Sequence, residues 1–547
     1  MTGRRSSELP GRGPSIVAAI LLLLLVAPPT LTPIVAAVVD AEAWRRLFSD
    51  APRLLQLYGR TLALAAGVVA IVVPSAAVLA VALFRFRTPG ARFLAFLGLA
   101  AAFAPLAVYD GGWQSCIGPY GFIRLASPGM PSVGGWPAVL AIHAAAALPW
   151  AFGVIAVGVR RVSTSLEESA LLDAGPLTVV RTVTLPQVRS SLILAAVLAA
   201  IPVLTDMSAT DLFQVRTLAE EVYTQMSESL HGEETTTLAL APLSVIAAAL
   251  LAVALLRWRD SCLRPPHQSK PFAWTVAARI WAAFALVIFA LSLAPLVGLV
   301  WQLGLVGGDP ETVHWSPRVA GTYVSESFHD VVTRGDSTSP MPLVPRELLR
   351  SMCVAAATVA AAVPTAWWWR WAGRRGRLFG VFVVGWIVAL PAPVLALGLM
   401  DLFNAEWTPN WLYALYNTRL PMCWGQLVRA LPIAWVAIGA ALEQMDQEAF
   451  DAARVAGAGS WGMLGRIALP LLEPTLWLAG VGVTALVLME LPVAKLLAPP
   501  GYDPLSMRIF SLLHQGTANQ QAGLCLVAIS ASTLLAIAAW FIVKRAD

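Results

Sequence analysis

The sequence is short of charged residues. Asp, Glu, Lys and Arg make up 13% of its 547 residues, whereas soluble domains carry about 25%. Hydrophobic residues make up 58%, and the mean hydropathy is +0.71. A soluble protein could not bury so much apolar surface, so the composition predicts an integral membrane protein surrounded by a lipid bilayer. The net charge of +5 then indicates basic loops beside a membrane. We expect no nucleic-acid partner, because no basic patch is interleaved with aromatic residues.

Several motifs of enzymes and metalloproteins are missing. The sequence has no HExxH, no GxSxG and no convincing cluster of loop carboxylates, which argues against a membrane enzyme. It has no Gly-x-x-x-x-Gly-Lys-Ser/Thr, so we do not expect this chain to bind ATP through a P-loop. The five cysteines form no CxxC pair, and we expect neither a metal site nor a cofactor in this chain. For Cys116 and Cys423, a disulfide and two free thiols are the alternatives, and free thiols are favoured.

Long apolar runs are abundant. A hydrocarbon core of about 30 Å requires about 20 apolar residues of helix, and about twelve segments come near that length. They fall at 16–39, 60–84, 93–109, 135–158, 191–211, 238–257, 275–303, 348–369, 378–403, 422–441, 475–495 and 522–543. The predicted fold is therefore an all-α integral membrane protein. Because the first run continues to Val39, we interpret it as an uncleaved helix and not as a secretory leader.

Basic residues predict the orientation of these helices. Clusters come before the first segment and after the second, fourth, sixth, eighth and twelfth. They are Arg4, Arg5 and Arg12; Arg85, Arg87 and Arg92; Arg160 and Arg161; Arg257, Arg259, Arg264 and Lys270; Arg370, Arg374, Arg375 and Arg377; and Lys544 and Arg545. All of them lie on one side if both termini are inside the cell, so the positive-inside rule predicts an N-in, C-in topology.

One stretch between two apolar segments is charged and rich in glycine. It is DAARVAGAGSWGMLGRIALP, residues 451–470, and EESALLDAGPLTVVRTVTLP, residues 167–186, aligns with it without a gap. The offset is 284 residues, the separation of Glu167 from Asp451. At this offset Asp206 aligns with Glu490, each an acid within an apolar segment. The chain therefore reads as two parallel six-helix repeats.

Local physical chemistry predicts a helix–turn–helix for this stretch. An acid suits the N-terminus of a helix, glycine permits a left-handed turn after it, and the Leu-Pro pair leads into the next span. The element would lie on the cytoplasmic surface and expose Val455, Trp461, Leu464 and Ile467 to a docking partner. The alternative is an amphipathic helix that rests on lipid headgroups.

Both stretches resemble the EAA loop of type I ABC importer permeases, which docks into a cytoplasmic ATPase. The second copy is close: it has Asp451-Ala452-Ala453, Gly457 at the signature glycine and Ile467-Ala468-Leu469-Pro470 at its end. The first copy has Glu167-Glu168-Ser169 and places Asp173 at the glycine position. The docking residues that the resemblance implies are Glu167, Glu168, Asp173, Gly175, Leu185 and Pro186 in the first copy, and Asp451, Ala452, Gly457, Gly459, Trp461, Leu469 and Pro470 in the second.

The resemblance also implies partners, a location and a solute. Such a permease works with two copies of an ATPase, which bind the ATP, and with a periplasmic solute-binding protein, in the bacterial cytoplasmic (inner) membrane. It is a transport subunit and not itself an enzyme. Residues 488–516 resemble the fused permeases of the ferric-iron branch, so ferric iron is the expected solute; thiamine, phosphonates or another small solute are alternatives. A secondary transporter or channel remains the competing class.

These observations divide the chain into five parts. An N-terminal tail, first helix and outer loop (1–56) precede the first permease half (57–257). A cytoplasmic linker (258–274) leads to a seventh helix with its outer loop (275–345), and the second half follows (346–547). Asp206 and Glu490 are candidates for the solute pathway, and a structural hydrogen bond is the equal alternative. For His143, a helix–helix hydrogen bond is favoured over a metal ligand.

Overall fold

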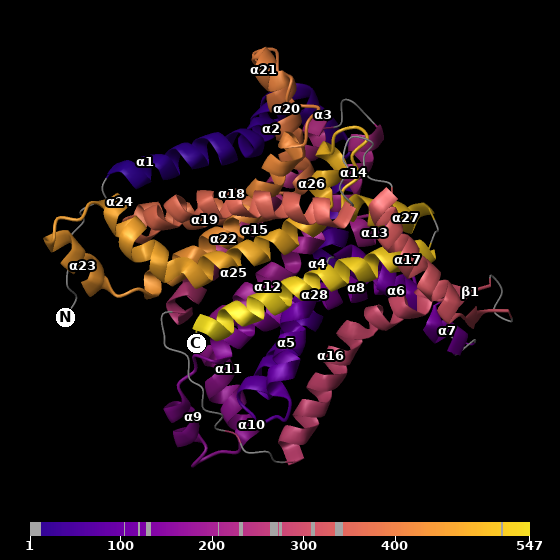
Figure 1. Cartoon of the computed structure of the whole chain (residues 1–547), viewed down its shortest axis with the longest axis horizontal. Coiled ribbons are helices and arrows are strands. Elements are labelled where there is room, and N and C mark those ends of the chain that lie inside the picture. The colour runs from indigo at the N-terminus through magenta and orange to yellow at the C-terminus, as the bar shows by residue number, and fades with distance from the viewer. Residues whose placement is uncertain are drawn as a thin grey trace.

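Long helices run side by side through the molecule in this computed structural model (Figure 1). The structure describes residues 12–102, 104, 106–118, 121–126, 129, 133–205, 207–228, 233–262, 272, 276–307, 312–333, 343–515 and 518–546. Each half has its own apolar core, built around α4, α8 and α12 in the first half and around α18, α22 and α25 in the second.

The first half extends from α4 to α15. Its helices are α4 (Ala51–Phe84), α5 (Ala91–Ala102), α6 (Leu106–Ile117), α7 (Phe122–Ala126), α8 (Gly135–Val159), α9 (Thr164–Ala170), α10 (Pro176–Val179), the π-helical turn η2 (Val180–Thr184), α11 (Leu185–Gln187), α12 (Arg189–Thr205), α13 (Ser208–Leu212), α14 (Leu218–Glu228) and α15 (Glu233–Cys262).

The second half repeats this order of elements. Its helices are α18 (Leu343–Trp371), α19 (Arg374–Ala389), α20 (Ala392–Asn404), α21 (Asn410–Tyr413), α22 (Leu420–Gln444), α23 (Gln447–Val455), α24 (Ser460–Met463), the π-helical turn η3 (Leu464–Ala468), α25 (Leu469–Met489), α26 (Pro492–Leu497), α27 (Leu505–Gln515) and α28 (Ala518–Ala546). An offset of 284 residues superposes η2 on η3 and α10 on α24.

The helix that precedes each half packs against the other half. The first consists of α1 (Arg12–Leu21), the π-helical turn η1 (Leu22–Val26) and α2 (Ala27–Val39), which pack against α18 and α20. In return, α16 (Val276–Leu303) packs against α4 and α6. The contact of α2 with α20 is close: a Cβ at Gly398 would lie 2.2 Å from the carbonyl oxygen of Pro29. Trp424 Nε1 donates a hydrogen bond to the carbonyl of Leu25 at 2.9 Å. Each half therefore packs against the helix that precedes the other half in the sequence.

The predicted number of spans is not confirmed. Among the described residues, eight helices are long and apolar enough to cross a membrane, or up to ten if each of two bent pairs is one span. The pairs bend by 71° between Gln187 and Arg189 and by 97° between Ala389 and Ala392. The predicted segment 93–109 is divided between α5 and α6, and 378–403 is the pair bent by 97°, because Pro391 cannot continue α19. The broader class, an all-α membrane protein, is supported.

Two other expectations change in detail, and the expectation of free thiols at Cys116 and Cys423 is confirmed. α15 continues through residue 262, so the predicted linker 258–274 begins as helix; most of the rest of it lies outside the described residues. Phe272 is described, and its N–H donates to the carbonyl of Arg85 at 3.3 Å. The outer loops hold α3 (Ala41–Ser49), α17 (Pro317–Thr333) and a short antiparallel pair, β1 (Leu305–Val306) with β2 (His314–Trp315). Cys116 and Cys423 are both free thiols.

Figure 1 shows the start of α1 and the end of α28 at the same end of the bundle, at the left of the view. The second loop, with α23 and α24, also lies on the left, and α9 and α10 lie at the lower left. This arrangement agrees with termini and loops on one side of a membrane. The N-in, C-in topology itself stays a prediction.

Candidate functional site

The second loop, residues 451–470, is a helix–turn–helix as predicted. Asp446 caps α23 by accepting a hydrogen bond from the Glu448 N–H. The chain then turns at Gly457, whose φ of +82° lies in the left-handed region, and enters α24. η3 and α25 follow without a break, so the loop leads directly into a long helix of the second half.

Two apolar side chains of this loop point into open space. Val455 is 90% exposed and Trp461 is 54% exposed. The prediction that Leu464 and Ile467 are displayed as well is wrong, because Leu464 is buried and Ile467 is half-buried against the core of the second half. Both residues lie in the π-helical turn η3, which directs them inward, and this turn was not predicted from the sequence.

The underside of α23 is fixed by aromatic packing. Phe450 is fully buried, with its ring 5.8 Å from that of Trp367 and 5.7 Å from that of Trp371. The Arg370 guanidinium lies 4.7 Å from the centre of the Phe450 ring, and its Nη2 donates to the carbonyl of Met445. This cluster holds α23 against the end of α18, so the loop is attached to two spans.

The first loop, residues 167–186, is held in place by an ionic contact instead. Glu167 is fully buried and accepts a hydrogen bond from the Thr184 hydroxyl at 2.6 Å. Its second carboxylate oxygen lies 3.3 Å from Nε of Arg85, which is also fully buried. Arg85 Nη2 donates to the carbonyl of Val162 at 2.7 Å. Burial lowers the pKa of the Arg85 guanidinium, and the Glu167 carboxylate opposes that shift. The resemblance implied that Glu167 contacts a docking partner, but the burial of its side chain prevents such a contact.

The two loops do not align throughout without a gap. Their helix caps, Ser163 and Asp446, and their buried side chains, Glu167 and Phe450, coincide at an offset of 283 residues, whereas α10 and α24 coincide at 284. The turn of the first loop is therefore one residue shorter. No residue between 163 and 189, all of them described, has a positive φ, so Asp173 replaces a glycine that this shorter turn does not need.

Most of the other predicted docking residues lie at the surface. In the first loop Leu172 is 86% exposed, and Leu166 and Leu177 are also exposed; these three leucines were not predicted. The predicted residues that are exposed are Glu168, Asp173, Gly175, Pro186, Asp451, Ala452, Gly457, Gly459, Trp461 and Pro470, and the half-buried ones are Leu185 and Leu469. Each loop thus presents an apolar tip beside exposed acids.

A cavity of about 480 Å³ lies between the two halves. The first half contributes residues of α6, α8 and α12, and the second contributes residues of α19, α22 and α25. The polar and aromatic lining residues are His143, Trp150, Thr205, Ser208, Gln426, Arg429 and Glu490. The helices that follow the two loops, α12 and α25, therefore both reach this cavity.

Glu490 makes structural hydrogen bonds and also faces the cavity, while its role in a solute pathway stays a prediction. It lines the cavity, and its carboxylate accepts hydrogen bonds from the N–H groups of Val493 (2.9 Å) and Ala494 (3.2 Å), which caps the N-terminus of α26. Its Oε1 lies 3.7 Å from Nε of Arg429. Asp206, the other candidate, lies outside the described residues. His143 also lines the cavity, with Nδ1 3.0 Å from the carbonyl oxygen of Val139 in its own helix.

A buried ionic cluster lies behind the cavity wall. Glu347 is fully buried between Arg346 and Arg350, and its carboxylate also accepts a hydrogen bond from the Tyr502 hydroxyl. Arg350 Nη1 donates to the side-chain oxygen of Gln426, which lines the cavity. This cluster was not predicted, although the sequence places two arginines close to an acid at the start of an apolar segment.

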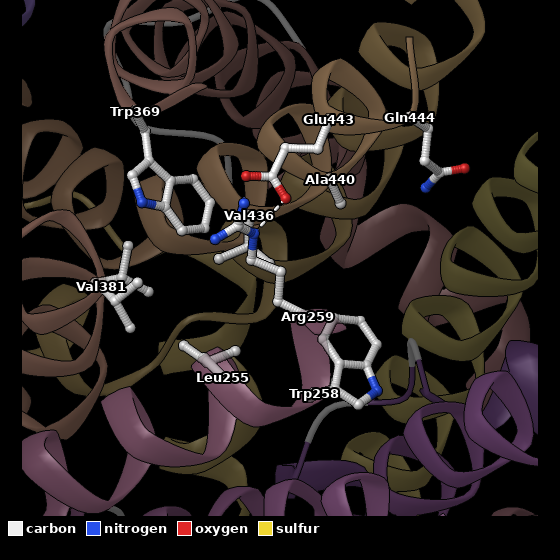
Figure 2. Close-up of a pocket in the computed structure, with 10 residues that line it drawn as sticks. Leu255, Trp258, Arg259, Trp369, Val381, Val436, Ala440, Glu443 and Gln444 are labelled. Atoms are coloured by element: carbon white, nitrogen blue, oxygen red, sulfur yellow. Dashed lines mark hydrogen bonds and ion pairs between the residues drawn. The ribbon is translucent and has the colours of Figure 1, made fainter. Parts of the chain in front are cut away.

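A second contact between the halves lies near the base of the second loop. Figure 2 shows Arg259 of α15 reaching the carboxylate of Glu443 in α22, with Trp369 beside this contact and Trp258 below it. Arg259 lies in the helical start of the predicted linker, and Glu443 precedes α23 by a few residues. The ion pair therefore connects the end of the first half to the span that enters the second loop.

Gly457 offers a direct test of the turn. Substitution by alanine is expected to cost about 1–2 kcal/mol of unfolding free energy, because a side chain disfavours left-handed backbone. Gly175→Ala is the matched control: its φ is −70°, and a Cβ would meet nothing within 4 Å at either glycine. We expect the control to change stability by less than about 0.5 kcal/mol. Denaturant unfolding of the purified variants measures both, and equal effects would contradict the turn described here.

Comparison with known proteins finds a family model that matches most of the second half. Residues 356–547 match the family model described as "Binding-protein-dependent transport system inner membrane component". This segment includes most of α18, the second loop and Glu490.

Two curated relatives illustrate the range of similar proteins. The "Spermidine/putrescine transport system permease protein PotC" of Escherichia coli (strain K12) is 24% identical over 170 residues, which cover 31% of this chain and 62% of the relative. The "Putative 2-aminoethylphosphonate transport system permease protein PhnV" of Salmonella typhimurium (strain LT2) is 27% identical over 184 residues, which cover 32% of this chain and 67% of the relative. The chain thus spans 62% of the length of the first relative.

Proposed function

We propose that this chain is the membrane permease of an ABC importer and that both of its halves form the solute pathway. One observation carries the proposal. Each of the two loops passes through a π-helical turn and leads to a helix that lines the cavity between the halves. The second loop leads directly into α25, and the first leads through α11 and a 71° bend into α12. The family match of residues 356–547 to a component of binding-protein-dependent transport supports it.

The geometry suggests how motion reaches the cavity. An ATPase that holds the exposed tip of the second loop would move α24 and η3, which are continuous with α25. α25 has 21 residues, so at 1.5 Å per residue it extends about 30 Å and ends at Glu490 in the cavity wall. A displacement of the loop is thereby converted into a displacement of the cavity wall. Switching of this kind requires that the ATPase bind the two states of the permease with different affinity.

The partners and location follow from the proposal. Two copies of a separate ATPase would dock, one on each loop, and hydrolyse the ATP. A periplasmic solute-binding protein would deliver the solute from the other side of a bacterial inner membrane. The chain itself would have the role of a transport subunit, like the relatives whose names describe permease proteins.

The proposal also concerns the class of solute. Ferric iron, expected from the resemblance, stays a prediction, and neither relative named above concerns iron. Their printed names concern spermidine, putrescine and 2-aminoethylphosphonate. The aminophosphonate agrees with the alternative of a phosphonate, so a small organic solute is now favoured over ferric iron.

Purification of the tagged chain from its own cells tests the proposal. After crosslinking and mild-detergent extraction, we expect mass spectrometry to identify a P-loop ATPase in amounts comparable to the permease. Uptake of solute should cease when ATP is depleted while the proton gradient is maintained. Uptake driven by a proton gradient alone, with no ATPase recovered, would instead establish a secondary transporter.

A further inference from the structure

The charged and amide side chains of the described cavity wall come from the second half. Gln426 and Arg429 lie on α22, and Glu490 lies at the end of α25. The first half contributes His143 and Trp150 from α8, and the rest of the wall is largely alanine, leucine and isoleucine. With about 480 Å³, the cavity falls within the range of about 300–1,000 Å³ that is typical of small-molecule sites.

Arg429 and Glu490 form a preorganised pair in this wall. The Glu490 carboxylate is fixed by the N–H groups of Val493 and Ala494. Arg429 is fixed through its Nη1, which donates to the carbonyl of Leu390 at 3.2 Å. The two charged groups are 3.7 Å apart at their closest atoms, and their side chains remain 24% and 12% exposed. Backbone hydrogen bonds therefore fix both side chains, and each keeps an exposed surface in the cavity wall.

A pair of opposite charges in an apolar wall selects for a complementary solute. A solute charge that enters such a site loses its hydration and is stabilised when an opposite charge replaces the water. The described wall offers a guanidinium, which binds carboxylate or phosphonate groups in a bidentate manner, and beside it a carboxylate that can accept from an ammonium. A solute that carries charge of one sign only would be attracted by one member of the pair and repelled by the other.

We propose that the cavity binds a small solute that carries both an acidic group and an ammonium group, with Arg429 opposite the acid and Glu490 opposite the ammonium. This inference rests on the proposed function, because it assigns the solute class of the same pathway. Trp150 adds a partly exposed aromatic face to the same cavity, and such a face attracts cations.

The test is equilibrium binding to the purified full chain in lipid nanodiscs, without ATPase or binding protein. The probes are 2-aminoethylphosphonate, ethylphosphonate (which lacks the ammonium), putrescine (which lacks the acid) and ferric citrate. We expect 2-aminoethylphosphonate to bind about tenfold or more tightly than each of the others, since a charged hydrogen bond is at stake in each comparison.

Variants assign the two charges. Arg429→Gln and Glu490→Gln should each weaken binding of 2-aminoethylphosphonate about tenfold, whereas Arg429→Lys, which keeps the charge but loses the bidentate contact, should weaken it less than Arg429→Gln does. Arg45→Gln is the matched control, because the Arg45 side chain is 78% exposed on α3 and Arg45 is not among the residues that line the cavity. Glu490→Gln also alters the cap of α26 and could prevent folding. In that case the binding measured for Arg429→Gln tests the inference.

Other outcomes overturn the inference. It fails if putrescine or ferric citrate binds more tightly than 2-aminoethylphosphonate, if Arg429→Gln binds as the native chain does, or if no probe binds. Its failure is distinguishable from failure of the proposed function, because recovery of an ATPase does not depend on these probes. Binding as expected without any ATPase would keep the solute class and remove the ABC coupling.

Discussion

Trp461→Asp should release the ATPase from the second loop. Trp461 is 54% exposed at the tip of that loop, and an aromatic anchor of this kind often accounts for about 2 kcal/mol or more of binding. The fold should survive, because the residue lies in the first turn of α24, where an acid suits the helix dipole. We expect the ATPase recovered with the permease, and ATP-dependent uptake, to fall about tenfold or more.

The control for this result is another exposed tryptophan. Trp411 of α21 is 69% exposed and lies well away from α23 and α24 (Figure 1). Trp411→Asp should leave ATPase recovery unchanged. Leu172→Asp, at the tip of the first loop, should also lower recovery, because two ATPase copies require two docking surfaces. If Trp461→Asp retains the native amount of ATPase, the second loop is not the docking surface and instead faces lipid headgroups.

Glu167→Ala should produce the largest loss of stability. Removal of one member of a buried ion pair costs about 3–5 kcal/mol, because the other charge stays buried without compensation. Here the remaining charge is Arg85, which is fully buried. We expect a clear fall in the unfolding midpoint of the purified protein in detergent, together with faster proteolysis within residues 163–189, since Glu167 joins α9 to η2 and to the end of α4.

Two further variants separate charge from packing. Glu168→Ala, at the exposed neighbouring position, should change stability by less than about 0.5 kcal/mol. The double variant Arg85→Met with Glu167→Leu should recover much of the loss, because a buried pair can be replaced by apolar side chains. If Glu167→Ala and Glu168→Ala have equal, small effects, the buried pair does not hold the first loop in place.

The parts of the structure that were predictable from sequence depend on local pattern. The two loops share glycines, acids and a terminal Leu-Pro at one spacing, so their repeated helix–turn–helix could be inferred before any coordinates. Glu490 was noticeable because an acid in an apolar segment is costly. The class of fold followed from composition, since so apolar a chain has few alternatives in water.

The parts that were missed depend on contacts between distant residues. Nothing near Glu167 in the sequence shows that Arg85 will bury it, so the residue was taken for a docking acid. The one-residue difference between the turns was hidden because an ungapped alignment matched at both ends of the loops. The bend at 390–391 leaves the hydropathy unchanged, so the segment 378–403 looked like a plain span.

The crossed first helix has a consequence for the order of events during synthesis. Its hydrogen bond from Trp424 to Leu25 joins residues 399 positions apart. At about 5–20 residues per second, the ribosome needs roughly 20–80 seconds to supply the partner. During that time the face of α2 meant for α20 is covered by lipid alone. Gly398 allows the close approach to Pro29, and so it acts late in folding, when α2 packs against α20. A larger side chain there would leave a chain that is inserted in the membrane without this contact between α2 and α20.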